Sequence, residues 1–130
     1  MASVKVFLRA EATHSLHQAH EKIHYITGAE QVFEKKQHFG ETEVWLLVYE
    51  KYFLRVNNFA TLTVLLTEEA GTQTAQIVVS GGGESMSNIS YGAEKRFAKD
   101  CVAALEEAGF AVDPKHSDEL PKGILDRFKK

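Results

Sequence analysis

The sequence predicts an α+β fold in which one antiparallel sheet is covered on one face by helices. Two observations lead to this prediction. Two long segments carry apolar residues at helical spacing, and five other segments have the composition or the alternation of strands. The strands also follow one another through turn signals, which makes their pairing antiparallel. The predicted order is β-α-β-β-β-β-α, with an optional short helix at the C-terminal end.

The N-terminal part is predicted to hold one strand and one helix. The segment "VKVFLR" (4–9) has the composition of a short strand, and residues 11–27 have a helical period. Gly28 is expected to cap the C-terminal end of that helix. The apolar face of the helix is formed by Ala12, Leu16, Ala19, Ile23 and Ile26.

Four more strands are expected in the middle of the chain, at residues 30–39, 42–56, 59–68 and 73–80. Gly40, the Asn57-Asn58 pair and the segment "EAGT" (69–72) separate them as turns. The last two strands alternate between apolar and polar residues, as strands with one buried face do. Their buried face is predicted to consist of Leu62, Val64, Leu66, Ala75, Ile77 and Val79.

A second helix is predicted at residues 91–110, with Ser90 as its N-cap and Gly109 as its stop signal. Its apolar stripe consists of Phe97, Cys101, Ala104, Leu105 and Ala108. The single cysteine therefore has the position of a buried core residue. Residues 118–129 have the pattern of a short amphipathic third helix.

The order of elements is similar to that of TATA-binding-protein-like and helix-grip folds. This is a likeness of fold, and it implies little about function. The 130 residues contain no repeat and no linker, and this length suits one hydrophobic core. We therefore expect a single α+β domain over residues 1–130.

Composition and charge exclude several classes of function. The formal net charge is -3, whereas a protein that binds nucleic acid through its phosphates needs a basic surface. The apolar stretches "VWLLVY" and "TLTVLL" are too short to span a bilayer, and no signal peptide is indicated. One cysteine allows no internal disulfide. We expect a cytoplasmic protein that binds neither nucleic acid nor membrane, and no cofactor is predicted.

The strand predicted at residues 42–56 has apolar residues on both faces. Leu46, Val48, Tyr52 and Leu54 fall on one face, and Trp45, Leu47, Tyr49 and Phe53 on the other. A strand with one solvated face does not have this pattern. We expect a second chain to shield the face that carries Trp45, which makes the protein a homodimer. The alternative is a small-molecule cavity between the sheet and the helix at 91–109.

Two segments, "VYEKYFLRVNNFATLTVLL" and "VSGGGESMSNISYGAEKRF", resemble a family of small uncharacterised bacterial proteins that is known only as a domain of unknown function. The resemblance covers roughly the C-terminal two thirds of the chain. It implies a bacterial source and supports the predicted fold. It implies no activity and no site residues.

Four histidines, His14, His17, His20 and His24, form a stripe along one flank of the first predicted helix. His20 borders the apolar face. The segment "HEKIH" (20–24) matches the pattern of zinc hydrolases, in which His20 and His24 would bind the metal and Glu21 would act as the base. No third ligand is evident in the sequence. We interpret the stripe as a solvated helix face, and the metal site remains the alternative.

Two further groups are candidates for ligand binding. The run Gly81, Gly82 and Gly83, with Ser85 after it, lies between a strand and a helix. Such a run is more typical of a bend with positive φ values than of an anion site made of backbone N–H groups. Glu50 lies among apolar neighbours on its strand. It is expected to be ion-paired or partly exposed, with a pocket as the alternative.

From these observations we predict an uncharacterised bacterial cytoplasmic protein without enzymatic activity, a homo-oligomeric binding or structural module. One alternative is a small-molecule binding module with its pocket between the sheet and the C-terminal helix. The other is a metal-dependent hydrolase that uses His20, Glu21 and His24.

Overall fold

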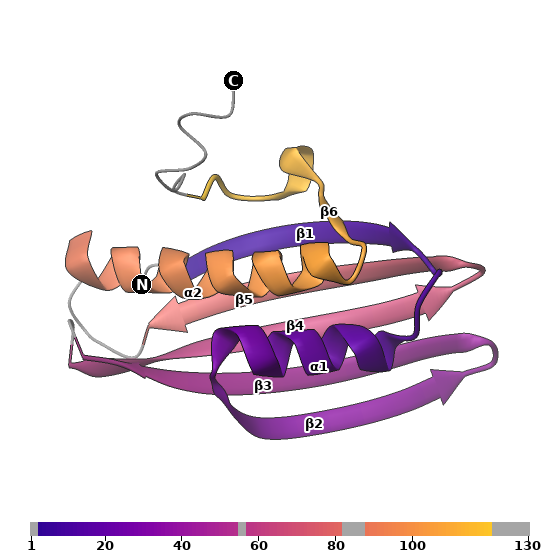
Figure 1. The fold of residues 1–130 in the computed structure, drawn as a ribbon, viewed down its shortest axis with the longest axis horizontal. Coiled ribbons are helices and arrows are strands. Elements are labelled where there is room, and N and C mark those ends of the chain that lie inside the picture. The colour runs from indigo at the N-terminus through magenta and orange to yellow at the C-terminus, as the bar shows by residue number, and fades with distance from the viewer. Residues whose placement is uncertain (1–2, 55–56, 82–87, 121–130) are drawn as a thin grey trace.

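Six strands form one antiparallel sheet in the order β2-β3-β4-β5-β1-β6 (Figure 1). The architecture is that of a computed structural model, which describes residues 3–54, 57–81 and 88–120, without the side chains of residues 88–91. Along the chain the elements are β1 (Ser3–Glu11), α1 (Leu16–Thr27), β2 (Glu30–Phe39), β3 (Thr42–Phe53), β4 (Asn58–Glu69), β5 (Thr72–Gly81), α2 (Asn88–Glu107), β6 (Ala111–Val112) and the 3-10 helix η1 (Pro114–His116).

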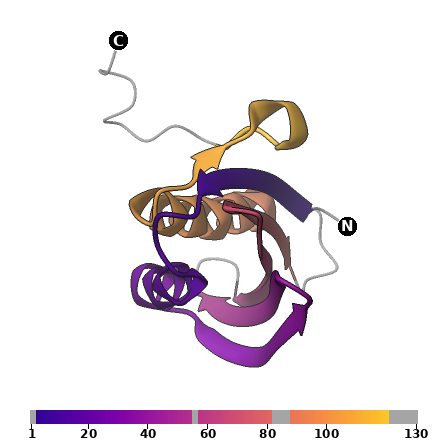
Figure 2. The same cartoon turned by 90° about the vertical axis from the view of Figure 1, so that its right-hand side faces the viewer.

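Both helices lie on the same face of the sheet, as Figure 2 shows, and they pack side by side. α2 contacts β5 and β1, while α1 lies over β4 and β3. The α+β class, the antiparallel sheet and the helices on one face are therefore confirmed. The expected order of elements is also observed up to α2.

The core lies between the helices and the sheet, and the alternation in the sequence explains it. Residues 62, 64 and 66 of β4 and residues 75, 77 and 79 of β5 are buried, as predicted, because every second side chain of a strand points to the same face. The stripe of α2 is buried as well, including Cys101. Leu16, Ala19 and Ile23 of α1 complete this layer.

The turn residues also behave as the sequence indicates. Gly28 ends α1 with a φ of 63°, and its N–H donates to the carbonyl of His24. Gly109, which follows α2, has a φ of 97°. Both values lie in the left-handed region that favours glycine.

The face predicted to need a partner is instead covered by the protein's own helices. Trp45, Leu47 and Tyr49 are buried, and Phe53 is partly buried against the core. The expectation that a second chain shields these four residues is therefore wrong. The reason is that α1 and α2 lie on this face of β3. The alternation of a strand does not show which of its two faces the helices cover. The opposite set, which includes Leu46, Val48 and Tyr52, lies on the face without helices.

The predicted helix boundaries differ from the observed ones. α2 begins at Asn88 rather than at residue 91, so Ser90, which was predicted as its N-cap, lies inside the helix. β1 extends to Glu11, which pairs with Thr72, so α1 starts only at Leu16 and His14 lies before the helix. After α2 the chain adds the short strand β6 to β1 and continues into η1. Residues 118–120 are not helical, and the rest of the predicted third helix lies outside the described residues.

Candidate functional site

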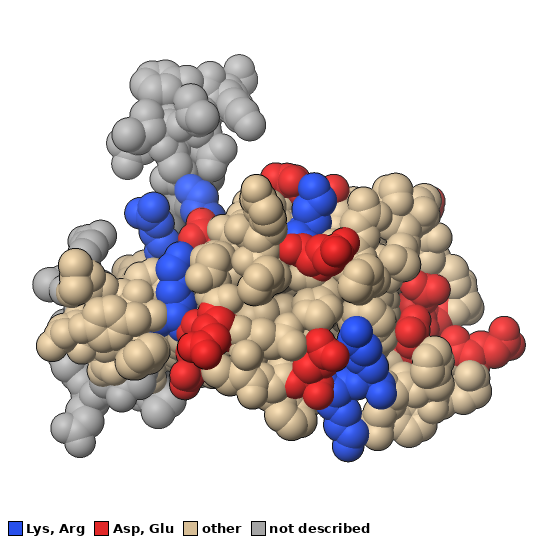
Figure 3. Space-filling view, turned by 60° about the horizontal axis from the view of Figure 1, so that its bottom comes forward, with Lys and Arg blue, Asp and Glu red and all other residues tan. Residues whose placement is uncertain are grey.

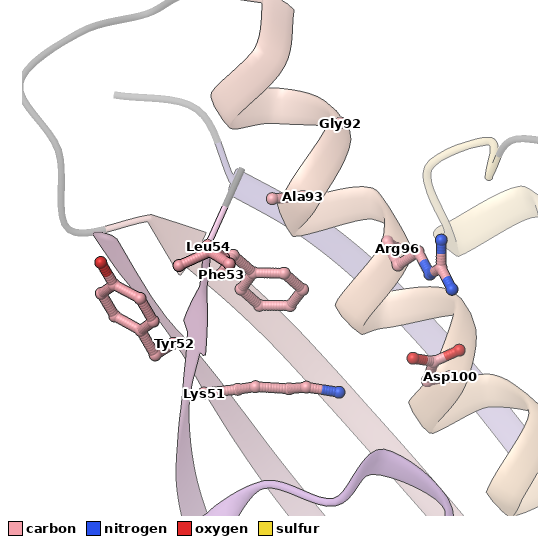
Figure 4. Close-up of a pocket in the computed structure, with 8 residues that line it drawn as sticks. All are labelled: Lys51, Tyr52, Phe53, Leu54, Gly92, Ala93, Arg96 and Asp100. Atoms are coloured by element: carbon pink, nitrogen blue, oxygen red, sulfur yellow. The ribbon is translucent and has the colours of Figure 1, made fainter. Parts of the chain in front are cut away.

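A pocket of about 300 Å³ lies where the end of β3 passes α2 (Figure 4). The strand contributes Lys51, Tyr52 and Phe53, and the turn after it contributes Leu54. The helix contributes Gly92, Ala93, Arg96 and Asp100. The last three recur at intervals of three and four residues, which places them on one side of a helix. The pocket therefore lies between the sheet and the second helix.

The apolar wall of the pocket is built on Phe53. Its ring lies 5.7 Å from the ring of the fully buried Phe97, centroid to centroid, so the core holds it in place. Ala93 is small, and a Cβ at Gly92 would meet no atom within 4 Å apart from its chain neighbours and the backbone of its own helix. The helix therefore leaves space in front of the ring. Leu54 is 81% exposed and forms part of the outer rim.

The polar side of the pocket carries two cations and one carboxylate. The ammonium group of Lys51 donates to the carbonyl of Thr27, the last residue of α1, over 2.7 Å, and its Nζ lies 5.6 Å from the centre of the Phe53 ring. Arg96 is exposed and Asp100 is half-buried. The ammonium group has three donors, and the bond to Thr27 uses one of them.

Glu94 lies on the same helix but belongs to the buried side. It is 2% exposed, and its Oε1 atom has no hydrogen-bond partner among the described residues. Burial raises the pKa of this carboxyl, and a hydrogen bond from the backbone of Gly81 lowers it in part. Our sequence interpretation missed this residue. Its position in the sequence could have indicated the burial. Glu94 stands three residues before Phe97, so it lies on the same side of the helix as the apolar stripe of α2.

The glycine run is only partly described. Gly81 is the last residue of β5 and pairs with Ala60, so it continues the sheet. Gly82, Gly83 and Ser85 lie outside the described residues. Glu50 lies in β3, between Glu30 and Thr61, on the sheet face without helices, where it is half-exposed. Neither Gly81 nor Glu50 lines the pocket beside Phe53.

The histidines do not converge on one point. His20 is turned toward the sheet, with its Nε2 atom 2.6 Å from Oε1 of Gln31 and its ring 6.0 Å from that of Trp45, centroid to centroid. His24 is exposed, and His17 lies 3.6 Å from Glu21. In the described part of the chain, no group of three His, Cys, Asp or Glu side chains could hold a metal ion. The metal-dependent hydrolase stays a prediction.

Two further polar groups are buried between the helices and the sheet. The hydroxyl group of Tyr49 and the Nδ1 atom of His20 have no hydrogen-bond partner among the described residues. Burial raises the pKa values of the Tyr49 hydroxyl and the Cys101 thiol, so both groups are protonated at neutral pH. Cys101 is therefore an inert core residue, as the sequence predicted.

The charges on the surface are mixed. On the face shown in Figure 3, Lys and Arg side chains lie next to Asp and Glu side chains and form no continuous basic surface among the described residues. None of the described helices is long and apolar enough to cross a membrane.

The chain is an α+β protein whose sheet is covered by helices on one face, with a pocket between β3 and α2. The chain belongs to a family of unknown function, DUF6054, whose family model matches residues 1–109. This confirms the resemblance to a domain of unknown function. No curated protein and no solved structure matches the chain.

Proposed function

We propose that the protein is a non-enzymatic module that binds a small organic anion in the pocket between β3 and α2. The observation that carries this proposal is the pairing of a fixed aromatic ring, Phe53, with two cationic side chains, Lys51 and Arg96, around one hollow. Binding sites for small molecules are usually concave, mostly apolar and equipped with a few placed polar groups.

The size of the pocket limits the ligand. Its volume of about 300 Å³ is at the lower end of the range for small-molecule sites, so a compact ligand fits best. An aromatic or short aliphatic carboxylate has suitable dimensions. Its apolar part would pack on Phe53 and Ala93, where the helix leaves space in front of the ring.

The charges favour a negative ligand group. Lys51 and Arg96 outweigh Asp100 by one positive charge at the rim. Lys51 is held in position by the carbonyl of Thr27, so it loses little side-chain entropy on binding. Arg96 has a planar fork of donors that suits a carboxylate.

The proposed setting is the bacterial cytoplasm. The resemblance of the sequence to small bacterial proteins supports the source. The one cysteine is a buried thiol, which suits a reducing compartment. A homodimer is compatible with this function, because the pocket is built from a single chain.

A titration followed by two-dimensional NMR tests the proposal. Benzoate is expected to shift the amide signals of Gly92 and Ala93, and benzylamine, which has the same ring and the opposite charge, is expected to leave them in place. Arg96→Gln should weaken benzoate binding by about tenfold, which corresponds to the loss of one charge-assisted hydrogen bond.

The matched control is Lys99→Gln, which removes a cation from the same helix at a position that does not line the pocket. It should bind benzoate like the unchanged protein. Equal responses to benzoate and benzylamine, or equal effects of the two substitutions, would show that the pocket does not select an anion.

A further inference from the structure

Asp100 is the carboxylate that lines the pocket beside Phe53. It lies one helical turn after Arg96 on α2, and the residue is half-buried. Among the described residues, its side chain forms no ion pair with Lys51 or Arg96 and no hydrogen bond. A ligand whose only charged group is a carboxylate would leave Asp100 without a partner, so the pocket contains a polar group that a simple organic anion does not explain.

Lys51 reaches the same pocket from the sheet. It lies on β3, and Figure 4 shows its side chain extending toward the part of α2 that carries Asp100. One donor of its ammonium group bonds to the carbonyl of Thr27, which leaves two donors for a ligand. The pocket thus offers an anchored cation and an unpaired carboxylate that are not in contact with each other. A ligand that carries both kinds of charge can bind to the two groups at once.

The ring of Phe53 lies close to this pair of charged groups. Phe53 follows Lys51 by two residues, so both side chains point to the helix-covered side of β3. The Nζ atom of Lys51 lies 5.6 Å from the centre of the Phe53 ring, and a compact ligand can therefore contact the ring and the ammonium group together. The Phe53 ring already packs on Phe97 at a distance that is typical of aromatic pairs, and the space beside Ala93 suits a third ring.

We propose that the ligand of this pocket is a free α-amino acid with an aromatic side chain. Its carboxylate accepts a hydrogen bond from Lys51, its ammonium group donates to Asp100, and its ring packs on Phe53. The inference rests on the proposed function, because the carboxylate of the amino acid is the anionic group that this function requires. It adds that the pocket also recognises the ammonium group of the ligand.

The charges of the pocket favour this ligand over its simpler analogues. A carboxylic acid without an amino group would leave Asp100 unpaired and close to a second negative charge. An amine without a carboxylate would lie near Lys51 and Arg96 with no group that neutralises either cation. A site whose polar groups are placed for one ligand rejects an analogue that leaves them unpaired. An amino acid satisfies the cationic and the anionic side of the pocket together.

The excess of cations sets the order of the affinities. Lys51 and Arg96 outweigh Asp100 by one charge, so the loss of the ligand carboxylate should weaken binding more than the loss of the ligand ammonium group. We therefore expect L-phenylalanine to bind most tightly, 3-phenylpropanoate less tightly and phenethylamine least. This order agrees with the expected selection of benzoate over benzylamine.

Isothermal titration calorimetry of the full chain with these three compounds at pH 7 tests the inference. The compounds share the ring and a two-carbon chain and differ in their charged groups. L-phenylalanine is expected to bind about tenfold more tightly than 3-phenylpropanoate, which corresponds to one charge-assisted hydrogen bond. Phenethylamine should give no measurable binding. This comparison uses the unchanged protein and does not depend on the folding of a variant.

Asp100→Asn should remove the tenfold preference, because it weakens the binding of L-phenylalanine and does not weaken that of 3-phenylpropanoate. Glu106→Gln is the matched control, since it removes a carboxylate from an exposed position of the same helix outside the pocket. It should leave the three affinities unchanged. Circular dichroism shows whether each variant is folded.

Equal affinities of the unchanged protein for L-phenylalanine and 3-phenylpropanoate would overturn the inference and leave the proposed anion site standing. Equal losses of both affinities in Asp100→Asn would have the same meaning. If neither carboxylate binds, the inference is also wrong, and the titration with benzoate then decides whether the proposed function fails with it.

Discussion

The Nε2 atom of His20 lies 2.6 Å from the Oε1 atom of Gln31, so a side-chain hydrogen bond ties α1 to the edge strand β2. The amide group of Gln31 in turn donates to Glu34 over 3.0 Å. The amide oxygen of Gln31 is therefore the acceptor for His20, and His20 carries its proton on Nε2. These two hydrogen bonds explain how the Nε2 atom of a histidine that borders the core finds a partner.

Gln31→Ala is expected to lower the free energy of unfolding by about 1–2 kcal/mol, because it leaves a nearly buried imidazole without its hydrogen-bond partner. Urea denaturation measures this change. Gln37→Ala is the control, since Gln37 is exposed on the same strand. Equal effects of the two substitutions would show that the bond to His20 contributes no stability.

The same chain of bonds makes stability depend on pH. The hydrogen bond from Gln31 is the main cause that lowers the pKa of Glu34, with a smaller effect of Lys36. A lowered pKa means that the folded state binds this proton less tightly than the unfolded state. The contribution of Glu34 to stability is therefore present above the ordinary value of 4.5 and is lost as the pH falls below it. Thermal melts of Glu34→Gln between pH 3 and 7 should show a smaller loss than those of the unchanged protein.

Tyr49→Phe is expected to raise the free energy of unfolding by about 1 kcal/mol, because the buried hydroxyl group has no partner among the described residues. The ring stays in place, so the packing against the helices is kept. Tyr25→Phe should have no effect, since Tyr25 is 87% exposed. A loss of stability in Tyr49→Phe would show that the hydroxyl group is hydrogen-bonded in solution.

Glu94→Gln is expected to stabilise the protein at pH 7 by about 1 kcal/mol, because a buried carboxylate is replaced by a neutral group of the same shape. Burial raises the pKa of Glu94, so the folded state binds this proton more tightly than the unfolded state. The stability of the unchanged protein should therefore fall as the pH rises above 4.5, and Glu94→Gln should remove that part of the fall. Glu106→Gln, which changes an exposed residue of the same helix, is the control for thermal melts over this range.

The fold was largely predictable because its signals are local. Strand alternation placed residues such as Leu62 and Leu66 in the core, and left-handed glycines such as Gly28 ended the helices where expected. The short strand β6 was not predictable, since its two residues have no period of their own. It exists because Asp113 and Ser117 anchor the segment to β1 through the carbonyl of Phe7.

The candidate site was less predictable, because it depends on which face of β3 the helices cover. Trp45 and Leu46 are equally apolar, and only the packing of α1 and α2 decides that Trp45 is inside. The pocket joins residues more than forty positions apart in sequence, Lys51 and Arg96, and no local pattern brings them together. The four histidines, in contrast, form a local pattern in the sequence, but their side chains do not converge in the structure. His20 is turned toward the sheet, and His24 is exposed.

The most direct test of the proposed pocket is a crystal structure with 4-bromobenzoate bound, located by the anomalous signal of bromine. We expect a bromine peak in the hollow formed by Phe53 and Ala93, with the carboxylate within hydrogen-bond distance of Lys51 or Arg96. A bromine peak elsewhere on the protein, or none at a concentration that saturates the NMR titration, would contradict it.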